Sequence, residues 1–162
     1  WYDAKINRIR EVIPNCAIST DIITGFCSET DEEHQDTVSL MKQVRYELAY
    51  MFFYSERPGT LAQKKFEDDV SEDVKKSRLK EIIDVQTKIN KELNEEEIGE
   101  IYEVLAEGIS KRDENDFRGR NSQNKVIIFP RENFKIGDYI KVKVEKSTSA
   151  TLIGKAVGIV NY

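Results

Sequence analysis

The stretch STDIITGFCSET, residues 19–30, decides the fold of the N-terminal half of this chain. Its first half is rich in β-branched residues and ends at Gly25, which is typical of a strand followed by a tight turn. Thr30 precedes Glu33 by three residues, the spacing of a capping box at the start of a helix. The stretch therefore predicts a strand within residues 17–26 that passes through an acidic turn into a helix. In α/β barrels, ligands bind where strands end in this way.

A second buried strand is predicted at residues 48–54, after the helix that Thr30 begins. The order strand–helix–strand indicates that the two strands are parallel neighbours. Because the first strand is apolar on both faces, we expect helices to cover both sides of the sheet. The inward stripe of the intervening helix comprises His34, Val38, Met41 and either Val44 or Arg45. On that stripe the single histidine is expected to be a core residue with no catalytic role.

The flanking segments extend the α/β pattern to residue 97. An amphipathic helix is predicted before Pro14, Pro58 and Gly59 predict a tight turn, and Ser71 is placed to cap a long helix. The inward stripe of that helix is predicted to be Leu79, Ile82, Ile83, Gln86, Ile89 and Leu93. Two strands cannot close a barrel, so residues 1–97 are expected to be the tail of a larger β/α sheet.

From residue 98 to residue 162 the hydrophobic pattern changes to a period of two. Ile140, Val142 and Val144 alternate with polar side chains, as in a half-buried strand of an antiparallel sheet. About five short strands separated by glycine-marked turns are predicted, which is typical of a small antiparallel OB-like β-barrel. The chain is therefore predicted to have two domains, 1–97 and 98–162.

The charge differs between these two parts of the chain. Residues 108–162 contain 11 Lys and Arg against 6 Asp and Glu, whereas the remaining residues contain 14 against 24. A basic C-terminal part favours an anionic partner such as nucleic acid, the alternative being a basic surface with no partner. Cys16 and Cys27 are too few for a disulfide framework or a metal site, and they suit a reducing cytoplasm. The chain begins in the middle of a pattern, so we expect it to be part of a longer protein.

Several motifs occur in the order found in one known family. IRxxIP (residues 9–14), STDIIxGFxxET (19–30), FxYSxRPGT (52–60) and VxxxRLxxIxxxQ (74–86) resemble the second half of the radical-SAM domain of the methylthiotransferases. EVLAEGISKR (103–112) and GRNSQNKVIIF (119–129) resemble the TRAM domain that ends those proteins. Nearly the whole chain is covered, in the right order, which makes the resemblance more specific than any single motif.

The resemblance implies that residues 1–97 are the C-terminal part of a partial TIM-like β/α barrel, and it implies a tRNA-modifying enzyme. The nearest branch of the family adds a methylthio group to C2 of N6-isopentenyladenosine next to the anticodon. Related branches act on threonylcarbamoyladenosine in tRNA or on a ribosomal protein. Such enzymes use S-adenosylmethionine and [4Fe–4S] clusters held by cysteines upstream of this region, the first set as CxxxCxxC. This chain has neither set, so it is expected to be inactive by itself and to position the cofactor only.

The resemblance also implies which residues contact the cofactor. Gly25 would let a planar adenine approach the backbone, and Ile23 would offer an apolar contact. Many radical-SAM proteins have GxIxGxxE here, but Asp21 replaces the first glycine and Glu29 lies one position late, so Glu29 could instead stabilise the helix N-terminus. Cys27 and Ser28 replace the Pro–Gly of the commoner family loop, so the turn is expected to be less rigid. The predicted cofactor-binding residues are Asp21, Ile23, Gly25, Glu29, Phe53 and Tyr54.

The predicted RNA contacts lie mainly in the basic module. Arg57 could bind a phosphate or a cofactor carboxylate, or form a structural ion pair with Asp21 or Glu29. Phe117 and Phe129 are candidates for base stacking, although Phe129 is expected to pack in the barrel. The predicted RNA-binding residues are Arg57, Lys111, Arg112, Arg118, Arg120, Asn124 and Lys125. The expected partner is the anticodon stem-loop of tRNA, with no membrane partner.

Two expectations complete the sequence analysis. The acidic runs at residues 67–69 and 94–97 are expected to be solvated surface and a linker. The alternative to an enzyme is a stand-alone RNA-binding protein whose α/β part is only a scaffold.

Overall fold

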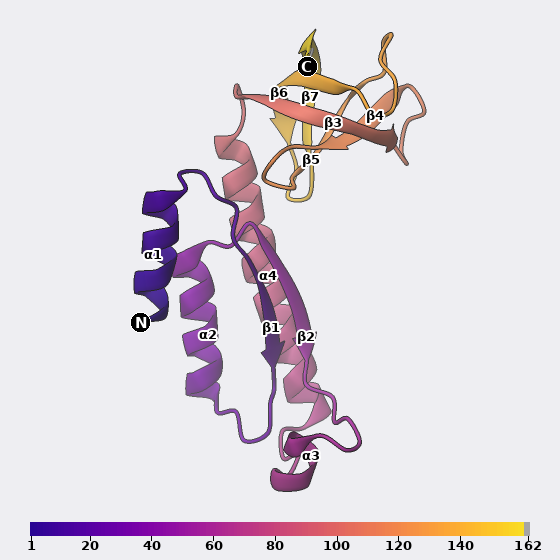
Figure 1. Cartoon of the computed structure of the whole chain (residues 1–162). Helices are drawn as coiled ribbons and strands as arrows, with labels where there is room; N and C mark the ends of the chain where they lie inside the picture. The colour runs from indigo at the N-terminus through magenta and orange to yellow at the C-terminus, as the bar shows by residue number, and fades with distance from the viewer. Residues whose placement is uncertain (161–162) are drawn as a thin grey trace. The chain divides into compact units, whose positions relative to one another are not determined.

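The computed structural model describes residues 1–160 and divides the chain into two compact units, residues 1–89 and the residues from Asn90 onward (Figure 1). The first unit alternates helices and strands in the predicted order. Its elements are α1 (Tyr2–Val12), β1 (Ser19–Thr24), α2 (Asp31–Val44), β2 (Leu48–Phe53), α3 (Leu61–Lys65) and most of α4 (Glu72–Glu96). None of the helices in residues 1–160 is long and apolar enough to cross a membrane.

The β1–α2–β2 segment forms as predicted. The two strands pair in parallel, with the register running from Ser19 opposite Leu48 to Thr24 opposite Phe53. At the start of α2, the Thr30 hydroxyl accepts from the backbone N–H of Glu33, while the Glu33 carboxylate accepts from the backbone N–H of Thr30. This capping box fixes where the helix begins and thereby sets the length of the turn after β1.

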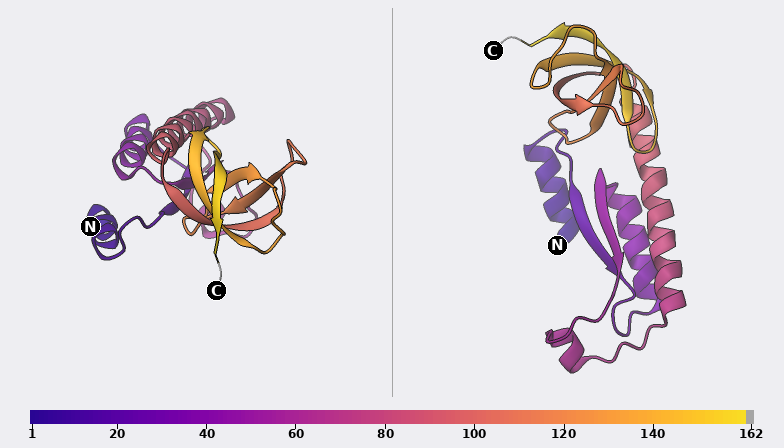
Figure 2. Two further views of the ribbon diagram at one scale, coloured as in Figure 1. Left: turned by 90° about the horizontal axis from the view of Figure 1, so that it is seen from above. Right: turned by 90° about the vertical axis from the view of Figure 1, so that its right-hand side faces the viewer.

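The prediction that helices cover both faces of the sheet is wrong for this unit. Helices α2 and α4 lie against one face of the two strands, whereas the other face is open (Figure 2). Ile23 is 58% exposed and its register partner Phe52 is 55% exposed on the open face, which also carries Asp21, Leu48 and Tyr50. The sequence shows that Ile23 and Phe52 are apolar, but it does not show whether residues 1–160 contain an element that covers them.

Helix α4 is bounded as predicted, and the Ser71 hydroxyl accepts from the backbone N–H of Val74 at 3.4 Å. Ile82, Gln86 and Ile89 are buried, but Ile83 is 41% exposed, so its predicted inward position is wrong. The buried row instead continues toward the N-terminus through Lys75, 5% exposed, and Arg78, 7% exposed. Positions 75, 78, 82, 86 and 89 follow helical spacing, so the inward face of the first turns is charged.

The second unit is the predicted small closed barrel. Its strands are β3 (Ile101–Ile109), β4 (Asp116–Arg120), β5 (Val126–Pro130), β6 (Tyr139–Ser147) and β7 (Leu152–Ile159). They close in the order β3-β4-β5-β7-β6, with all pairs antiparallel except β5 and β7, which are parallel. The core contains the inward-facing side chains of all five strands: Val104, Ala106, Phe117, Ile127, Phe129, Ile140, Val142, Val144 and Leu152.

The last turns of α4 belong to the barrel unit rather than to a free linker. The Asn94 side chain, 9% exposed, donates to the backbone carbonyl of Thr148 at 2.9 Å. Glu97, whose side chain is 14% exposed, pairs with Lys125 and accepts from the Tyr102 hydroxyl. The expectation that residues 94–97 are solvated linker is therefore wrong, because two of these side chains fasten the helix end to the barrel.

Candidate functional site

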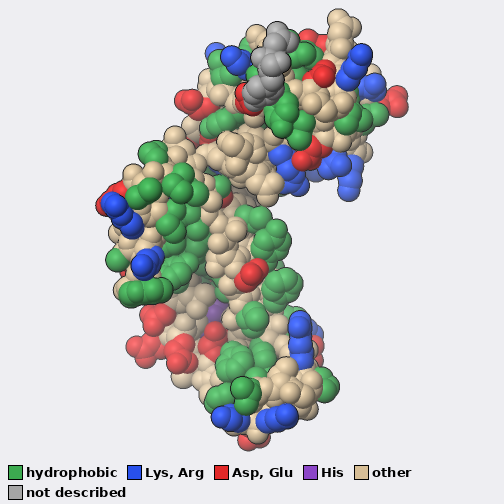
Figure 3. Space-filling view, viewed as in Figure 1, with side chains coloured by type: hydrophobic (Ala, Val, Ile, Leu, Met, Phe, Trp, Pro, Cys, Tyr) green, Lys and Arg blue, Asp and Glu red, His purple; other side chains and the backbone are tan. Residues whose placement is uncertain are grey.

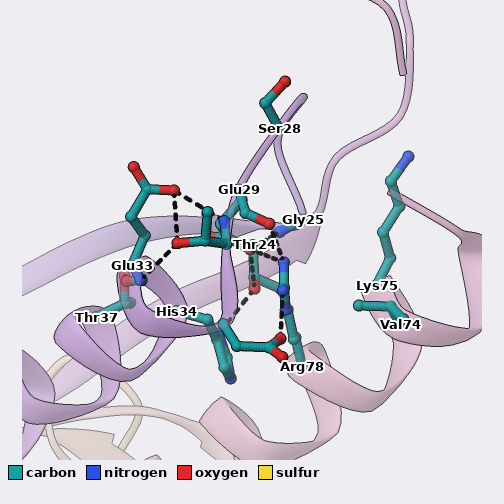
Figure 4. A network of polar contacts seen from close by, with 12 residues as sticks. Thr24, Gly25, Ser28, Glu29, Glu33, His34, Thr37, Val74, Lys75 and Arg78 are labelled. Carbon is teal, nitrogen blue, oxygen red and sulfur yellow. Dashed lines mark hydrogen bonds and ion pairs between the residues drawn. The ribbon is translucent and has the colours of Figure 1, made fainter. Parts of the chain in front are cut away.

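The turn between β1 and α2 is closed by the carboxylate of Glu29 (Figure 4). This carboxylate accepts hydrogen bonds from the Gly25 backbone N–H at 2.6 Å and from the Thr24 hydroxyl at 3.3 Å. From α4, the Arg78 guanidinium donates to the same carboxylate at 2.8 Å and to the Glu29 carbonyl at 2.9 Å. The two side chains are only 12% and 8% exposed. Because a desolvated carboxylate is costly unless it is paired, this ion pair stabilises one geometry of the turn.

A second branch of the network runs through His34 into the helices. Nδ1 of His34 lies 3.2 Å from the Thr24 hydroxyl, and Nε2 lies 2.9 Å from the Glu81 carboxylate on α4. Hydrogen bonds from His34 and Gln35 lower the pKa of Glu81. With 3% of its surface exposed, His34 is the core histidine that the sequence predicted. It connects the end of β1 to α4.

Position 25 requires a glycine because of its backbone conformation and because a lysine packs against it. Its φ of +70° lies in the left-handed region, and a Cβ at this position would meet Cγ of Lys75 at 2.5 Å. The Lys75 stem thus lies across Gly25, while its ammonium pairs with Asp68 and sits 5.3 Å from the centre of the Tyr54 ring. The space beside Gly25 is therefore filled by this lysine.

The segment before α4 is fastened to the same turn. The Asp69 carboxylate accepts from the backbone N–H of Ser28 at 2.6 Å and from its hydroxyl at 3.1 Å. The backbone hydrogen bond lowers the pKa of Asp69. Ser28 has φ +64°, a conformation that favours glycine, so Asp69 helps to hold a strained residue in place. Residues 67–69 are exposed, as expected of surface residues, but Asp68 and Asp69 also make specific contacts with Lys75 and Ser28.

Tyr54, the residue after β2, belongs to an aromatic cluster next to Lys75. Its side chain is 9% exposed, and the Phe26 ring packs edge-on against it at 4.9 Å between ring centres. Burial raises the pKa of Tyr54, and the neighbouring Cys27 thiol adds to this effect. Phe66 packs against Phe26 at 6.0 Å. Phe26, Phe66 and Tyr54 thus form an aromatic cluster beside Lys75, in which Tyr54 is buried and the two phenylalanines are exposed.

On the barrel, some of the predicted cations are exposed and some are paired. Lys111 and Arg112 are exposed in the loop between β3 and β4, and Arg118 is half-buried on the outward side of β4. Arg120 contacts Glu107 at 3.4 Å and donates to the Asn124 side chain at 2.8 Å, so these residues hold one another. Figure 3 shows blue and red side chains interleaved over this unit.

The two phenylalanines proposed for stacking are core residues. Phe117 is 2% and Phe129 0% exposed, with ring centres 6.2 Å apart. The expectation for Phe117 is therefore wrong, since inward positions of β4 are filled to close the small barrel. Lys125 is likewise a structural cation, because its side chain is only 12% exposed and is paired with Glu97.

Comparison with known proteins places both units in one family. Residues 95–157 match the TRAM domain family. Over 98% of its length the chain is 52% identical to the tRNA-2-methylthio-N(6)-dimethylallyladenosine synthase of Christiangramia forsetii, of which it covers 33%. Over 97% of its length it is 51% identical to the synthase of the same name from Parabacteroides distasonis, of which it covers 34%. The chain belongs to the methylthiotransferase family. It spans about a third of the length of the curated relatives it matches.

The cofactors of methylthiotransferases fit this chain unequally. No group of three or more side chains that could hold a metal ion occurs within residues 1–160, and the cysteines are Cys16 and Cys27 alone. The residues present therefore do not fit an iron–sulfur cluster. They do fit the nucleoside of S-adenosylmethionine, because Ile23 and Phe52 offer an exposed apolar surface beside the carboxylate of Asp21.

The six residues predicted for the cofactor of the methylthiotransferase do not form one cluster. Asp21 and Ile23 lie together on the open sheet face, whereas Gly25 and Glu29 lie in the hydrogen-bonded turn. Tyr54 packs with Lys75, and Phe53 is half-buried on the side of the sheet opposite Phe52. Of the six, Asp21 and Ile23 are exposed, Glu29 and Phe53 are half-buried, and Gly25 and Tyr54 are buried.

Sequence analysis missed two pairs of residues that shape the site. Tyr50 and Phe52 are exposed beside Asp21 and Ile23, and strict alternation along β2 could have shown that they share a face. Lys75 and Arg78 were missed because charged residues were assigned to solvent. Their burial could have been inferred from their positions, since Arg78 and Lys75 extend the buried stripe of α4 by one and two turns toward its N-terminus.

Arg57 lies in the turn after β2, where the Thr60 N–H donates to its carbonyl at 3.3 Å. The predicted Pro58–Gly59 turn is confirmed, with Gly59 at φ +82°. The Arg57 side chain is exposed, and Glu29, its proposed ion-pair partner, is bound by Arg78 instead. Arg57 therefore remains available for an anionic ligand.

Proposed function

We propose that this chain is part of a tRNA methylthiotransferase that adds a methylthio group to C2 of N6-isopentenyladenosine next to the anticodon. The whole enzyme would use S-adenosylmethionine and [4Fe–4S] clusters, with the cluster cysteines outside this chain. The observation that carries the proposal is the identity of about half of the residues, over nearly the whole chain, with synthases of that name. Because such an enzyme acts on tRNA, a cytoplasmic location of the protein is favoured.

The first unit would hold the nucleoside end of S-adenosylmethionine. Ile23 and Phe52 would contact the base on the open sheet face, and the carboxylate of Asp21 can accept hydrogen bonds from ribose hydroxyls. Glu29 and Arg78 would act as positioning residues, because they fix the conformation of the turn after β1. When bound to its cluster, the cofactor supplies the radical chemistry and the methyl group, while these residues bind and orient it.

The barrel would hold the RNA. Its strand order and its parallel β5–β7 pair are those of an OB-type barrel, in which the outer surface of the second and third strands and the adjoining loops bind oligonucleotides. Lys111, Arg112 and Arg118 lie on that part of the barrel, and Arg57 lies on the first unit. Their contribution would be phosphate contacts, which hold RNA without reading its sequence.

Reconstitution of the full-length protein tests the proposed reaction. With both clusters, S-adenosylmethionine and a reductant, isopentenylated tRNA should yield the methylthio nucleoside in a mass spectrum of the digested tRNA. The same tRNA without the isopentenyl group is the control. Product on threonylcarbamoyladenosine tRNA or on ribosomal protein instead would move the protein to another branch of the family, and no product on any of them would refute the assignment.

A second measurement tests the nucleoside site. Phe52→Ser in the full-length protein should weaken binding of S-adenosylmethionine while leaving the visible absorption of the clusters unchanged. Leu61→Ser, in a side chain that is 69% exposed on α3, is the control and should bind as the unchanged protein does. Equal binding by the two variants would remove the open sheet face from the cofactor site.

The chain by itself is proposed to be inactive, and this separates the enzyme from a stand-alone RNA-binding protein. The coding sequence upstream of Trp1 decides between them. Cluster-type cysteines encoded there support the enzyme, and a reading frame that starts at Trp1 would favour the binding protein.

A further inference from the structure

The outward side of β6 and β7 carries a row of exposed lysines. Along β6 the inward residues Ile140, Val142 and Val144 are at most 1% exposed, so the alternate residues face solvent. We define the β6–β7 lysine surface as four exposed side chains, Lys141, Lys143, Lys146 and Lys155.

The strand register concentrates these charges. Lys143 lies directly opposite Lys155 in the antiparallel pair, and like charges at opposed positions destabilise a sheet. Only Lys155 is neutralised, by Glu145 at 2.7 Å, and this pair raises the pKa of Lys155. Within residues 1–160 neither Lys141 nor Lys143 forms an ion pair. Two lysines therefore lie opposite each other on β6 and β7 with one carboxylate, Glu145, paired to one of them.

The opposite side of the barrel has no such excess. On β4, the preceding loop and the Glu107 that pairs with Arg120, the charged side chains are Lys111, Arg112, Arg118 and Arg120 against Glu107, Asp113, Glu114 and Asp116. Four cations thus meet four carboxylates. Around the β6–β7 lysine surface, β3 contributes Glu103, which lies opposite Lys141, and β6 contributes Glu145, while the second glutamate of β3, Glu107, is paired with Arg120. Two carboxylates thus stand beside four lysines. Attraction for a polyanion is consequently greater on the β6–β7 side.

The same surface offers spacing and apolar contact suited to an unpaired nucleic acid strand. Side chains two apart on a strand repeat at roughly 7 Å, so Lys141 and Lys143 can meet successive phosphates of an extended backbone. Tyr139, 39% exposed, continues the row on β6, and Val157 on β7 is 48% exposed. Cations beside an exposed aromatic ring are the combination by which proteins hold single-stranded RNA.

We propose that the β6–β7 lysine surface binds the phosphate backbone of the RNA loop, with Tyr139 as a stacking partner for a base. The proposal rests on the proposed function, in that it assigns the RNA of that function to a surface. It places the main electrostatic contact on the β6–β7 side and leaves Lys111, Arg112 and Arg118 as secondary phosphate contacts. Arg120 and Lys125 are bound to Glu107 and Glu97.

Salt-dependent binding tests the assignment. The 162-residue chain is titrated with a fluorescently labelled anticodon stem-loop RNA across a series of potassium chloride concentrations. Lys141→Gln with Lys143→Gln should reduce the slope of log affinity against log salt by about 1.4, since each lost phosphate contact removes about 0.7 from it. Lys80→Gln with Lys88→Gln, two exposed lysines on α4, makes the same change in net charge and should leave the slope unchanged.

Three results would overturn the proposal. The strand pair and the α4 pair could give the same slope, or Lys111→Gln with Arg112→Gln could reduce the slope while the strand pair does not. A polyglutamate competitor could also displace the RNA at equal charge concentration, which would indicate an acidic protein partner. If the unchanged chain binds no RNA at any salt concentration, RNA binding by this part of the proposed function fails as well.

Tyr139→Ala separates stacking from charge. It should lower the affinity about tenfold with the slope unchanged, because stacking involves no counterion release. An unchanged affinity would exclude Tyr139 from the interface, and unchanged amide spectra of each variant show that the barrel is intact.

Discussion

Replacing Arg78 by methionine removes the central cation of the turn after β1. Methionine keeps most of the length of the alkyl stem, so the variant loses charge and hydrogen bonds more than volume. Arg78 forms two ion pairs, and the one with Asp31 counts little, because the Asp31 side chain is 97% exposed. The ion pair with Glu29 decides the effect, since the two side chains are 8% and 12% exposed.

The magnitude follows from what remains around Glu29. Breaking a buried ion pair costs about 3–5 kcal/mol, because one charge is left desolvated. Here the carboxylate keeps the hydrogen bond from Gly25 at 2.6 Å, which offsets part of that loss. We expect Arg78→Met to lower the free energy of unfolding of the first unit by about 2–4 kcal/mol.

Urea unfolding followed by circular dichroism at the helix band measures this loss. The described helices all lie within residues 2–96, mostly in the first unit, so the helix signal reports mainly on that unit. With a slope of about 1–2 kcal/mol per molar urea, the midpoint should fall by roughly 1–4 M. Lys80→Met, two positions along α4 with a side chain 77% exposed, is the matched control and should leave the stability nearly unchanged.

A double-mutant cycle isolates the ion pair. Glu29→Gln keeps an acceptor for the Gly25 N–H but removes the charge, so Arg78→Met should cost less in that background. We expect a coupling free energy of about 2 kcal/mol between the two positions. A loss in Arg78→Met no greater than in Lys80→Met, or a coupling near zero, would show that solvent already screens this pair and would refute the reasoning.

Three further predictions concern packing, pH and the helix end. Gly154→Ala should destabilise the barrel by about 1–3 kcal/mol in calorimetry, because the added Cβ would lie 2.2 Å from the Lys143 carbonyl oxygen. Gly158→Ala, where the added Cβ has open space around it, should cost less than half as much. Equal losses of stability in the two variants would contradict the packing argument. Because the pKa of Glu81 is lowered in the folded protein, its contribution to stability is complete above its unfolded pKa of about 4.3 and is lost as the pH falls. Glu81→Gln should therefore flatten the acid-induced loss of stability between about pH 5 and 3. An unchanged pH profile of stability would contradict this role of Glu81. Glu97→Gln should lower barrel stability by about 1–3 kcal/mol, because the pair with Lys125 is largely buried, and Glu145→Gln, in an exposed pair, should lower it much less. The reverse order in thermal melts would show that burial does not govern the strength of these pairs.

Local chemistry made much of this fold predictable. The Thr30–Glu33 capping box, the Ser71 cap and the alternation of Ile140, Val142 and Val144 each depend on residues a few positions apart. Their physical causes are complete within one turn of helix or one strand. The parallel β1–β2 pair and the five-stranded barrel followed from the order of such elements.

The candidate site was harder to predict because its residues meet across long sequence separations. Gly25, Glu29 and Thr24 are neighbours in sequence, but the residues that complete the turn are Lys75 and Arg78, which lie on α4. A charged side chain in a helix gives no sign by itself that its partner lies on another element. Exposure of Ile23 and Phe52 was equally hidden, since an apolar strand looks the same whether its far face is covered or open.

By itself, the sequence determined the order of the helices and strands, the two units and the family. Periodicity, caps and motif order are local properties, and they survive in a chain that spans a third of its relatives. Only the tertiary structure decided which charges are paired within the fold and which are free. Arg78, Lys75 and Lys125 stabilise the fold because burial forces each to have a carboxylate partner, while Lys141 and Lys143 remain in solvent and can meet another anion.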